Sequence, residues 1–467
     1  MPSDLKKLLM GIYFYPRGGS AHVNRALARE FEQGGFKVTV MSGSRSDLGE
    51  HALASSFYSG LDLRTIDFTP ALGSGNPLRF DGGPGTAPMH GSYEDRPGAA
   101  DPVLSSLDDD AYECQVEAWT RELELAGGAT ADLLYLHHLT PINEAAARAF
   151  PGVPVLGHVH GTELLMLERI AAGPPASWTH AEQWRLRLGE WAAACERIVV
   201  SNADGLERAA SLLEVEPERF VAVPNGFDPT FAPGQIDRAD HWHRALAEHP
   251  QGWRPGEPAG SVAYEEADLA ALGGTVLTYV GRFTEIKRLP LLIEAFAQAR
   301  RRFAGAVALV LVGGHPGEWE GEHPIETVER LAVPDVFLAG WHSHADLPDL
   351  LRASDALVHA SVHEQFGQVL VEAMACGLPT IAVDRGGPAE IVDDPDTGWL
   401  VEPDDAGALA DAMVAAVNDP EDRQLRGRRA RGEVVGTYAW KSIGNDLAVV
   451  ADRLCRVPAD KVDIGSA

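Results

Sequence analysis

Short apolar runs alternate with amphipathic stretches of helical periodicity along most of the chain. Strands that alternate with helices are typical of βαβ units, so this pattern predicts an α/β protein with two doubly wound parallel sheets in tandem. The strands predicted for the first sheet are residues 8–14, 37–42, 62–68, 133–138, 154–160, 197–202 and 219–225. Those predicted for the second are residues 275–282, 306–314, 336–341, 356–361, 379–384 and 398–403.

Two segments interrupt the alternation. Residues 72–110 are rich in Gly, Pro, Ser and Asp, which predicts either a disordered segment or a functional loop. Residues 229–261 show no clear period and are interpreted as the connection between two domains, 1–228 and 229–436. A tandem pair of doubly wound domains favours a ligand crevice at the carboxyl ends of the strands.

Length and charge narrow the possible functions. A chain of 467 residues fits two domains of about 200 residues each. The formal net charge of -29 argues against nucleic acid as a partner, so a phosphate-bearing ligand needs a few placed cations and N–H groups. Four scattered cysteines favour reduced thiols and a cytoplasmic location. The apolar run near the N-terminus is too short to span a bilayer, so stable membrane insertion is not expected.

A glycine pair follows the first predicted strand. Gly18 and Gly19 turn the chain, and a helix is expected from about Ser20. Backbone N–H groups at a helix N-terminus can bind an anion, and glycines allow a phosphate to approach closely. The G-x-G-x-x-G spacing of a dinucleotide site is absent from this stretch. A plain tight turn is the alternative interpretation.

Two cations follow the strand predicted at 275–282. Arg282 stands at its end, and Lys287 lies where the next helix begins. Together they could present a planar fork and a point charge to a diphosphate. Surface cations flanking a loop are the alternative, although such a pair is less expected as background in a strongly acidic chain.

The stretch "HEQFGQVLVEAMACG" places two glutamates around the start of a predicted helix at 367–377. Glu364 falls in the loop after a strand, and Glu372 lies among apolar residues one to two turns inside the helix. A buried carboxylate needs partners, which the vicinal hydroxyls of a ribose could supply to Glu372. Glu364 could reach a sugar hydroxyl. A salt bridge or cap is the alternative for each. The N–H groups freed at the first turn are those near Phe366, Gly367 and Gln368.

Taken together, these stretches resemble the retaining GT-B glycosyltransferases of glycosyltransferase family 4. Two glutamates separated by seven residues, with Phe-Gly after the first, match the signature of that family. "VPNGFDPTFAP", "YVGRFTEIKRL" and "LVLVGG" resemble its other markers, and "TYAWKSIGNDL" resembles its closing helix. The resemblance implies two Rossmann-like domains facing a central cleft, with a C-terminal helix at about 437–467 that packs back on the first domain.

The resemblance also implies roles for individual residues. Glu372 would hold the ribose of a nucleoside diphosphate sugar, and Glu364 with the backbone at 366–368 would hold the donor sugar. The family places a histidine near that sugar, for which His160 is the better candidate and His158 the weaker one. The diphosphate would be held by Arg282, Lys287 and the amides at Gly18 and Gly19.

The implied activity is transfer of a sugar, with retention, to a small acceptor such as a sugar, a cyclitol or a natural-product intermediate. No metal or other cofactor is expected. The donor identity stays open because Gln368 and Phe227 depart from the family pattern. A nucleotide-sugar epimerase of the same fold and a non-catalytic nucleotide-sugar-binding protein are the alternatives. The catalytic candidates are His160, Glu364, Arg282 and Lys287, and the acceptor candidates are Arg17, His22, His137 and His138.

Overall fold

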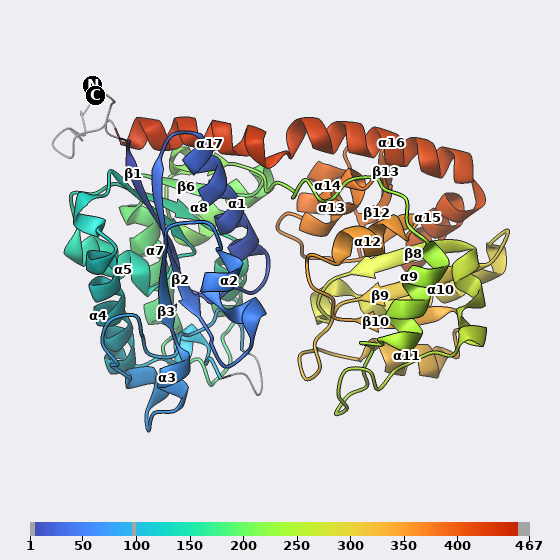
Figure 1. Ribbon diagram of the computed structural model, residues 1–467, viewed down its shortest axis with the longest axis horizontal. Coiled ribbons are helices and arrows are strands. Elements are labelled where there is room, and N and C mark those ends of the chain that lie inside the picture. Colours follow the sequence, from blue (N-terminus) through green and yellow to red (C-terminus); the bar gives the residue numbers. More distant parts are fainter. Residues whose placement is uncertain (1–4, 96–99, 456–467) are drawn as a thin grey trace. The chain divides into compact units, whose positions relative to one another are not determined.

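The computed structural model of the chain describes residues 5–95 and 100–455 (Figure 1). Contacts divide the chain into two compact units. Unit 1 comprises Met1–Asn225 and Trp440–Ala467, and unit 2 comprises Gly226–Ala439. The sequence predicts the corresponding boundaries after residues 228 and 436.

Unit 1 is built on a seven-stranded parallel sheet with the order β3-β2-β1-β4-β5-β6-β7. Each strand that the apolar pattern predicts in this half is present, with ends that differ by a few residues, so this prediction is confirmed. The strands are β1 (Lys7–Ile12), β2 (Lys37–Ser44), β3 (Leu63–Asp67), β4 (Leu133–His137), β5 (Val155–His158), β6 (Arg197–Val200) and β7 (Phe220–Ala222).

Helices cover both faces of this sheet because successive strand side chains point to opposite sides. Leu8 and Met10 face the side covered by α1 and α17, whereas Leu9 belongs to the core on the other side. The helix α17 packs on α1 within unit 1 and buries Leu447 and Ala451 (Figure 1). The helices are α1 (Gly19–Gln33), α2 (Ala54–Phe57), α3 (Thr69–Leu72), α4 (Asp109–Leu125), α5 (Pro141–Ala149), α6 (Thr162–Ala171), α7 (Ala181–Ala194), α8 (Ala203–Leu213) and α17 (Trp440–Leu454).

The Gly- and Pro-rich segment at 72–110 packs into the core of unit 1 over much of its described length. Met89 and Leu104 are fully buried, and the Tyr93 hydroxyl donates a hydrogen bond to the carbonyl of Leu139. Disorder is therefore the wrong interpretation for the described part, because its buried apolar residues anchor a chain with little regular structure. Residues 96–99 lie outside the described residues.

Unit 2 contains a six-stranded parallel sheet with the order β10-β9-β8-β11-β12-β13. This repeats the doubly wound order of the first six strands of unit 1, and every strand predicted in this half is confirmed. The strands are β8 (Thr275–Val280), β9 (Val307–Val312), β10 (Val336–Gly340), β11 (Ala356–His359), β12 (Thr380–Val383) and β13 (Gly398–Val401).

The helices of unit 2 include all four that the pattern predicts, at α10 to α13. They are α9 (Arg238–His243), α10 (Leu289–Ala299), α11 (Pro324–Leu331), α12 (Leu347–Arg352), α13 (Gln368–Ala375), α14 (Gly387–Ile391), α15 (Ala406–Asn418) and α16 (Pro420–Thr437). Across residues 5–95 and 100–455, no helix combines the length and apolarity that crossing a membrane requires.

The interpretation of residues 229–261 as an irregular connection is wrong. The segment belongs to unit 2, where α9 and a π-helical turn at Arg244–Glu248 bury Trp242 and Leu246 against one face of the sheet. Trp253 is buried as well, and its ring nitrogen donates to the carbonyl of Gly314 at 3.2 Å. The few apolar residues are separated by His and Arg, and a π turn departs from the 3.6-residue period, so the pattern conceals this helix.

Candidate functional site

Most of the predicted site residues follow the central strands of the two sheets. In a doubly wound sheet, ligands bind at the carboxyl ends of the strands, where the strand order reverses. This reversal lies between β8 and β11 in unit 2 and between β1 and β4 in unit 1. Arg282 and Glu364 follow β8 and β11, whereas Gly18 follows β1 and His137 ends β4. Each unit therefore carries its candidates at its own switch point.

Glu364 is the centre of a partly buried charged cluster in unit 2. Its Oε2 atom forms an ion pair with Nζ of Lys287 and lies 3.0 Å from Nε2 of His359. The side chains of Lys287 and Glu364 are only 13% and 20% exposed. Burial acts to raise the pKa of Glu364, but the charge of Lys287 and the His359 hydrogen bond hold this pKa well below its ordinary value. Glu364 is therefore a carboxylate near neutral pH.

Tyr279 connects this cluster to Arg282. The buried Tyr279 hydroxyl donates to the backbone carbonyl of Arg282 at 2.8 Å, and its ring stacks on that of His359 with centroids 6.1 Å apart. Burial raises the pKa of Tyr279 well above its ordinary value, Glu364 raises it further, and the positive charge of Arg282 lowers it. Tyr279 thus contacts both the backbone of Arg282 and the ring of His359, which in turn contacts Glu364.

The helix α13 positions Glu372. It begins at Gln368, one residue after the predicted start at 367, and the preceding Gly367 has a φ of 101°. The Glu372 side chain is buried, and its Oε1 atom accepts from Nε2 of His344 at 2.8 Å and from Nε2 of Gln368 at 3.4 Å. Gln368 also donates to the carbonyl of Gly226 at 2.6 Å. Among the described residues, both hydrogen bonds of the carboxylate use Oε1. Glu372 can therefore keep its bonds to His344 and Gln368 while Oε2 accepts from a ligand.

Gly18 has a backbone conformation that requires glycine. Its φ of 72° and ψ of -175° lie in a region that essentially only glycine occupies. It precedes α1, which begins at Gly19. A Cβ atom added at either position would meet nothing within 4 Å among the described residues. The turn therefore leaves room for a ligand beside the first N–H groups of α1, as close approach of a phosphate would require.

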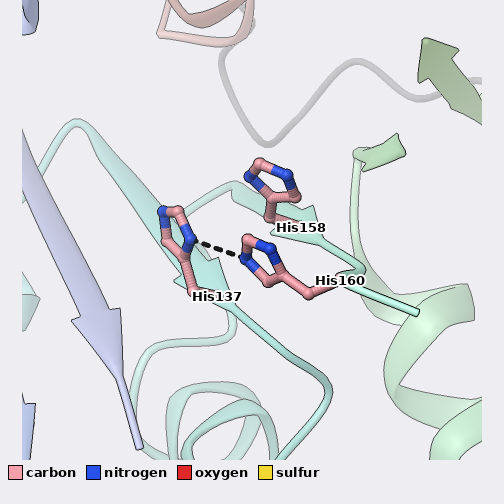
Figure 2. Close-up of side chains that lie close together, drawn as sticks. All are labelled: His137, His158 and His160. Atoms are coloured by element: carbon pink, nitrogen blue, oxygen red, sulfur yellow. Dashed lines mark hydrogen bonds between the residues drawn. The ribbon is translucent and has the colours of Figure 1, made fainter. Parts of the chain in front are cut away.

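A cluster of histidines lies at the carboxyl ends of β4 and β5. Figure 2 shows that His137, His158 and His160 face one another, with Nδ1 of His137 2.9 Å from Nε2 of His160. The rings of His158 and His160 stack with centroids 4.1 Å apart, and the ring of His138 lies 4.6 Å from that of His160. Burial lowers the pKa values of His137, His158 and His160 well below the ordinary range, and the neighbouring histidines lower them further. These three imidazoles are therefore neutral at neutral pH.

Two further side chains fix the orientation of this histidine cluster. The Tyr135 hydroxyl lies 2.7 Å from Nδ1 of His158, and a carboxylate oxygen of the buried Glu163 lies 2.7 Å from Nδ1 of His138. His138 also has a left-handed φ of 67°, which costs a residue other than glycine about 1–3 kcal/mol. Burial acts to raise the pKa of Glu163, but His138 and backbone N–H groups lower it below its ordinary value.

Arg17 and His22 contact other parts of unit 1. Arg17 donates to Oδ2 of the buried Asp101 at 2.8 Å and to the Tyr15 hydroxyl at 2.8 Å, so its charge has an internal partner. The ring of His22 packs edge-on against Phe57, with centroids 5.0 Å apart. The structure thus brings His137, His138 and His160 together but gives Arg17 and His22 separate surroundings. Their role towards an acceptor remains a prediction.

The sequence pattern did not predict the residues that form hydrogen bonds with the predicted site residues. His359 ends β11 five positions before Glu364, and a histidine at the end of a buried strand was a usable signal. Glu163 follows His160 closely, and a carboxylate so near a histidine pair could also have been considered. His344 contacts Glu372 from a loop far away in the sequence, so the pattern contained no signal for it.

The fold is shared with solved structures, among them a glycosyltransferase from Rickettsia africae ESF-5, which matches with a TM-score of 0.64 and 15% identity over 97% of this chain and 99% of that chain. Anabaena Alr3699/HepE in complex with UDP and glucose matches with a TM-score of 0.65 and 17% identity, over 96% of this chain and 100% of that chain. The two doubly wound units therefore define a GT-B fold.

Sequence relatives identify the family within this class. The family model for glycosyl transferases group 1 matches residues 264–433. A D-inositol 3-phosphate glycosyltransferase of Saccharomonospora viridis is 30% identical over 324 residues, which cover 66% of this chain and 67% of that protein. The Nocardia farcinica protein of the same name is 29% identical over 260 residues, covering 55% of this chain and about half, 52%, of that relative's length. The chain belongs to the glycosyl transferases group 1 family.

Proposed function

We propose that the chain is a retaining glycosyltransferase that moves a sugar from a nucleoside diphosphate sugar to a small acceptor. The observation that carries the proposal is the cluster of Lys287, Glu364 and His359, with Arg282 nearby, at the switch point of the unit 2 sheet. A family model that covers this region and a structural neighbour bound to UDP and glucose support the same assignment.

The donor is assigned to unit 2 by the chemistry of its groups. Arg282 and Lys287 supply positive charge for the diphosphate, and N–H groups at the start of α13 supply hydrogen bonds. Glu372, whose Oε1 is held by His344, presents Oε2 to the ribose hydroxyls. Glu364 is assigned to the donor sugar because a carboxylate accepts strongly from sugar hydroxyls. The roles towards the donor that the family resemblance implies for His160 and for the amides at Gly18 and Gly19, all in unit 1, remain predictions.

Breaking the bond between the sugar and the diphosphate leaves negative charge on the departing phosphate and an electron-poor anomeric carbon. Placed cations and N–H groups stabilise that charge, which is the main catalytic effect proposed here. The acceptor hydroxyl attacks from the face that the diphosphate leaves, and its proton passes to the departing phosphate oxygen. Glu364 is engaged by Lys287 and His359, so it is assigned to binding and electrostatics rather than to nucleophilic attack. The transfer itself is expected to need no metal.

The proposed acceptor is a small polar molecule such as a sugar, a cyclitol or a natural-product intermediate. Two relatives are named D-inositol 3-phosphate glycosyltransferases, which favours a cyclitol or its phosphate as the first compound to test. The candidates for this contact are the polar side chains of unit 1, including His137 and His138.

A screen of nucleoside diphosphate sugars by thermal shift, followed by turnover with an acceptor panel, tests the proposal. Mass spectrometry should detect the acceptor plus one sugar, and NMR should show that the anomeric configuration of the donor is kept. Glu364→Gln should lose turnover and still bind the nucleoside diphosphate without its sugar. Glu433→Gln, which changes an exposed carboxylate on α16, should behave as the wild type. Conversion of the donor to an epimer without acceptor, or binding without any transfer, would overturn the proposal.

A further inference from the structure

We propose that His137, His158 and His160 form a binding site for a divalent transition-metal ion of the zinc class (Figure 2). One ring nitrogen from each residue can be chosen so that all three lie within 4.8 Å of one another. The three residues come from the ends of two adjacent strands, since β4 pairs with β5 in a register that sets His137 beside His158. Imidazole nitrogens are ligands that Zn²⁺, Ni²⁺ and Cu²⁺ bind well.

One pair of ring nitrogens is already close to the spacing found around a coordinated ion. Zinc–nitrogen bonds of about 2.0–2.1 Å place two tetrahedral ligand nitrogens roughly 3.3–3.4 Å apart. Nδ1 of His137 and Nε2 of His160 are 2.9 Å apart, so this pair needs to open by only a few tenths of an ångström. The ring nitrogen of His158, the third ligand, has to move towards this pair by a larger distance than the pair opens.

Ring rotation supplies the required movement. A lone pair lies in the plane of its imidazole, whereas the rings of His158 and His160 are stacked, with planes 15° apart. Binding therefore requires the rings to turn about their terminal torsion, which is broad for histidine and has no steep rotamer wells. His160 is the least buried of the three, so an ion can reach the cluster past this residue.

The surroundings match those of a metal-binding histidine cluster. Nε2 of His158 is buried and has no hydrogen-bond partner among the described residues. The Tyr135 hydroxyl oxygen lies 2.7 Å from Nδ1 of His158 and can accept a hydrogen bond from an Nδ1–H group, which would leave Nε2 as the ligand atom. Such an outer partner fixes the tautomer of a metal-binding histidine. With three protein ligands, a fourth position would remain for water or an anion, as in catalytic zinc sites.

This metal site goes beyond the proposed transfer reaction, which is assigned no metal. His160 is common to both assignments, so metal binding has to be measured without any donor sugar. A failure of the metal site would leave the donor site of unit 2 untouched, and a failure of the transfer reaction would leave the histidine cluster intact.

The experiment uses the full chain without an added histidine tag, stripped of metal with a chelator. Calorimetric titration with Zn²⁺ should give one ion per chain, and Co²⁺ should give the visible absorption of a tetrahedral nitrogen site. His158→Gln and His137→Gln should each lower the affinity by about 100-fold or more, beyond the effect of an outer-shell change. Tyr135→Phe, which removes one hydroxyl and keeps the ring, should lower it about 10-fold.

His180→Gln is the matched control, since this residue lies on the same unit and, within the described part of the chain, forms hydrogen bonds only with Gln183 and with backbone groups. It should bind Zn²⁺ as the wild type does. Near-ultraviolet circular dichroism shows whether each variant is folded, and Tyr135→Phe keeps the test decisive if a histidine variant does not fold. The proposal is overturned if the wild type takes up no stoichiometric ion, or if folded His137→Gln and Tyr135→Phe bind Zn²⁺ as tightly as the wild type.

Discussion

The assignment of Glu372 to the ribose of the donor can be tested with a single charge change. Glu372→Gln keeps the size of the side chain and one acceptor oxygen, and it removes the negative charge. A hydrogen bond to a charged group is worth about 1.5–3 kcal/mol, against about 0.5–1.5 kcal/mol for a neutral one. The loss is therefore about 1–1.5 kcal/mol for each ribose hydroxyl, or roughly 2–3 kcal/mol for two. This corresponds to roughly 30- to 150-fold weaker binding of the nucleotide.

The assay is a cycle that combines the variant with a changed ligand. Calorimetry measures the affinity of wild type and Glu372→Gln for the nucleoside diphosphate that gives the largest thermal shift, and for its 2′-deoxy analogue. Loss of the hydroxyl should weaken the wild type by about 10- to 150-fold, and the variant by only about 2- to 12-fold. The exposed Glu433→Gln is the matched carboxylate-to-amide control and should reproduce the wild type. The ribose assignment is refuted if both proteins lose the same factor on removal of the hydroxyl, because the carboxylate and the hydroxyl would then not interact.

Further predictions follow from the same site and from the first turn of unit 1. Lys287→Met should weaken binding of a nucleoside diphosphate about 10- to 100-fold, consistent with the loss of one charge-assisted hydrogen bond. Binding of the parent nucleoside, measured by calorimetry, should weaken much less. Equal weakening for the two ligands would contradict a contact between Lys287 and the diphosphate. Glu364→Gln should destabilise the fold by about 2–3 kcal/mol at pH 7, between the values of exposed and buried ion pairs. The pKa of Glu364 is held below its ordinary value of 4.5, so this stabilisation is fully present above pH 4.5 and is lost as the pH falls below it. The difference in Tm between wild type and variant should therefore shrink in acid. A difference that stays constant down to pH 3 would count against the ion pair. Gly18→Ala should lower the free energy of unfolding by about 1–3 kcal/mol, because alanine is strained at the positive φ of this position. Gly19→Ala, which also adds its Cβ in open space, should lower it by less. If thermal unfolding ranks the two variants in the opposite order, the φ of Gly18 does not determine the loss of stability.

The strand framework was predictable because a parallel sheet covered on both faces leaves its strands as short, nearly continuous apolar runs. Runs such as residues 307–312 are buried along their whole length, so they stand out against amphipathic helices. The segment around Trp242 was missed because its few apolar residues make sense only against the face of a sheet formed by distant strands. The same holds for the buried part of residues 72–110, where burial depends on tertiary contacts that no local period encodes.

The site was predictable where a residue follows a strand directly, since topology then gives its position. Glu364, Arg282 and Lys287 belong to this class, and the ion pair between Glu364 and Lys287 agrees with their placement beside two adjacent strands. The partners supplied by distant loops were not predictable, and His344 is the example. The approach of His158 to His137 follows from strand register, which the sequence does not specify before the pairing is known.

The chain order of unit 1 has a consequence for how the protein is made. Its α1 helix and the α17 helix that covers it lie at opposite ends of the sequence, with all of unit 2 encoded between them. During synthesis on the ribosome, the apolar side of α1 near Leu27 and Phe31 therefore stays without its packing partner until Leu447 and Ala451 have been synthesised. Unit 2, whose residues are continuous in sequence, can complete its own core before that moment. A chain truncated shortly before residue 440 would thus contain a folded second unit and a first unit that still exposes the apolar face of α1.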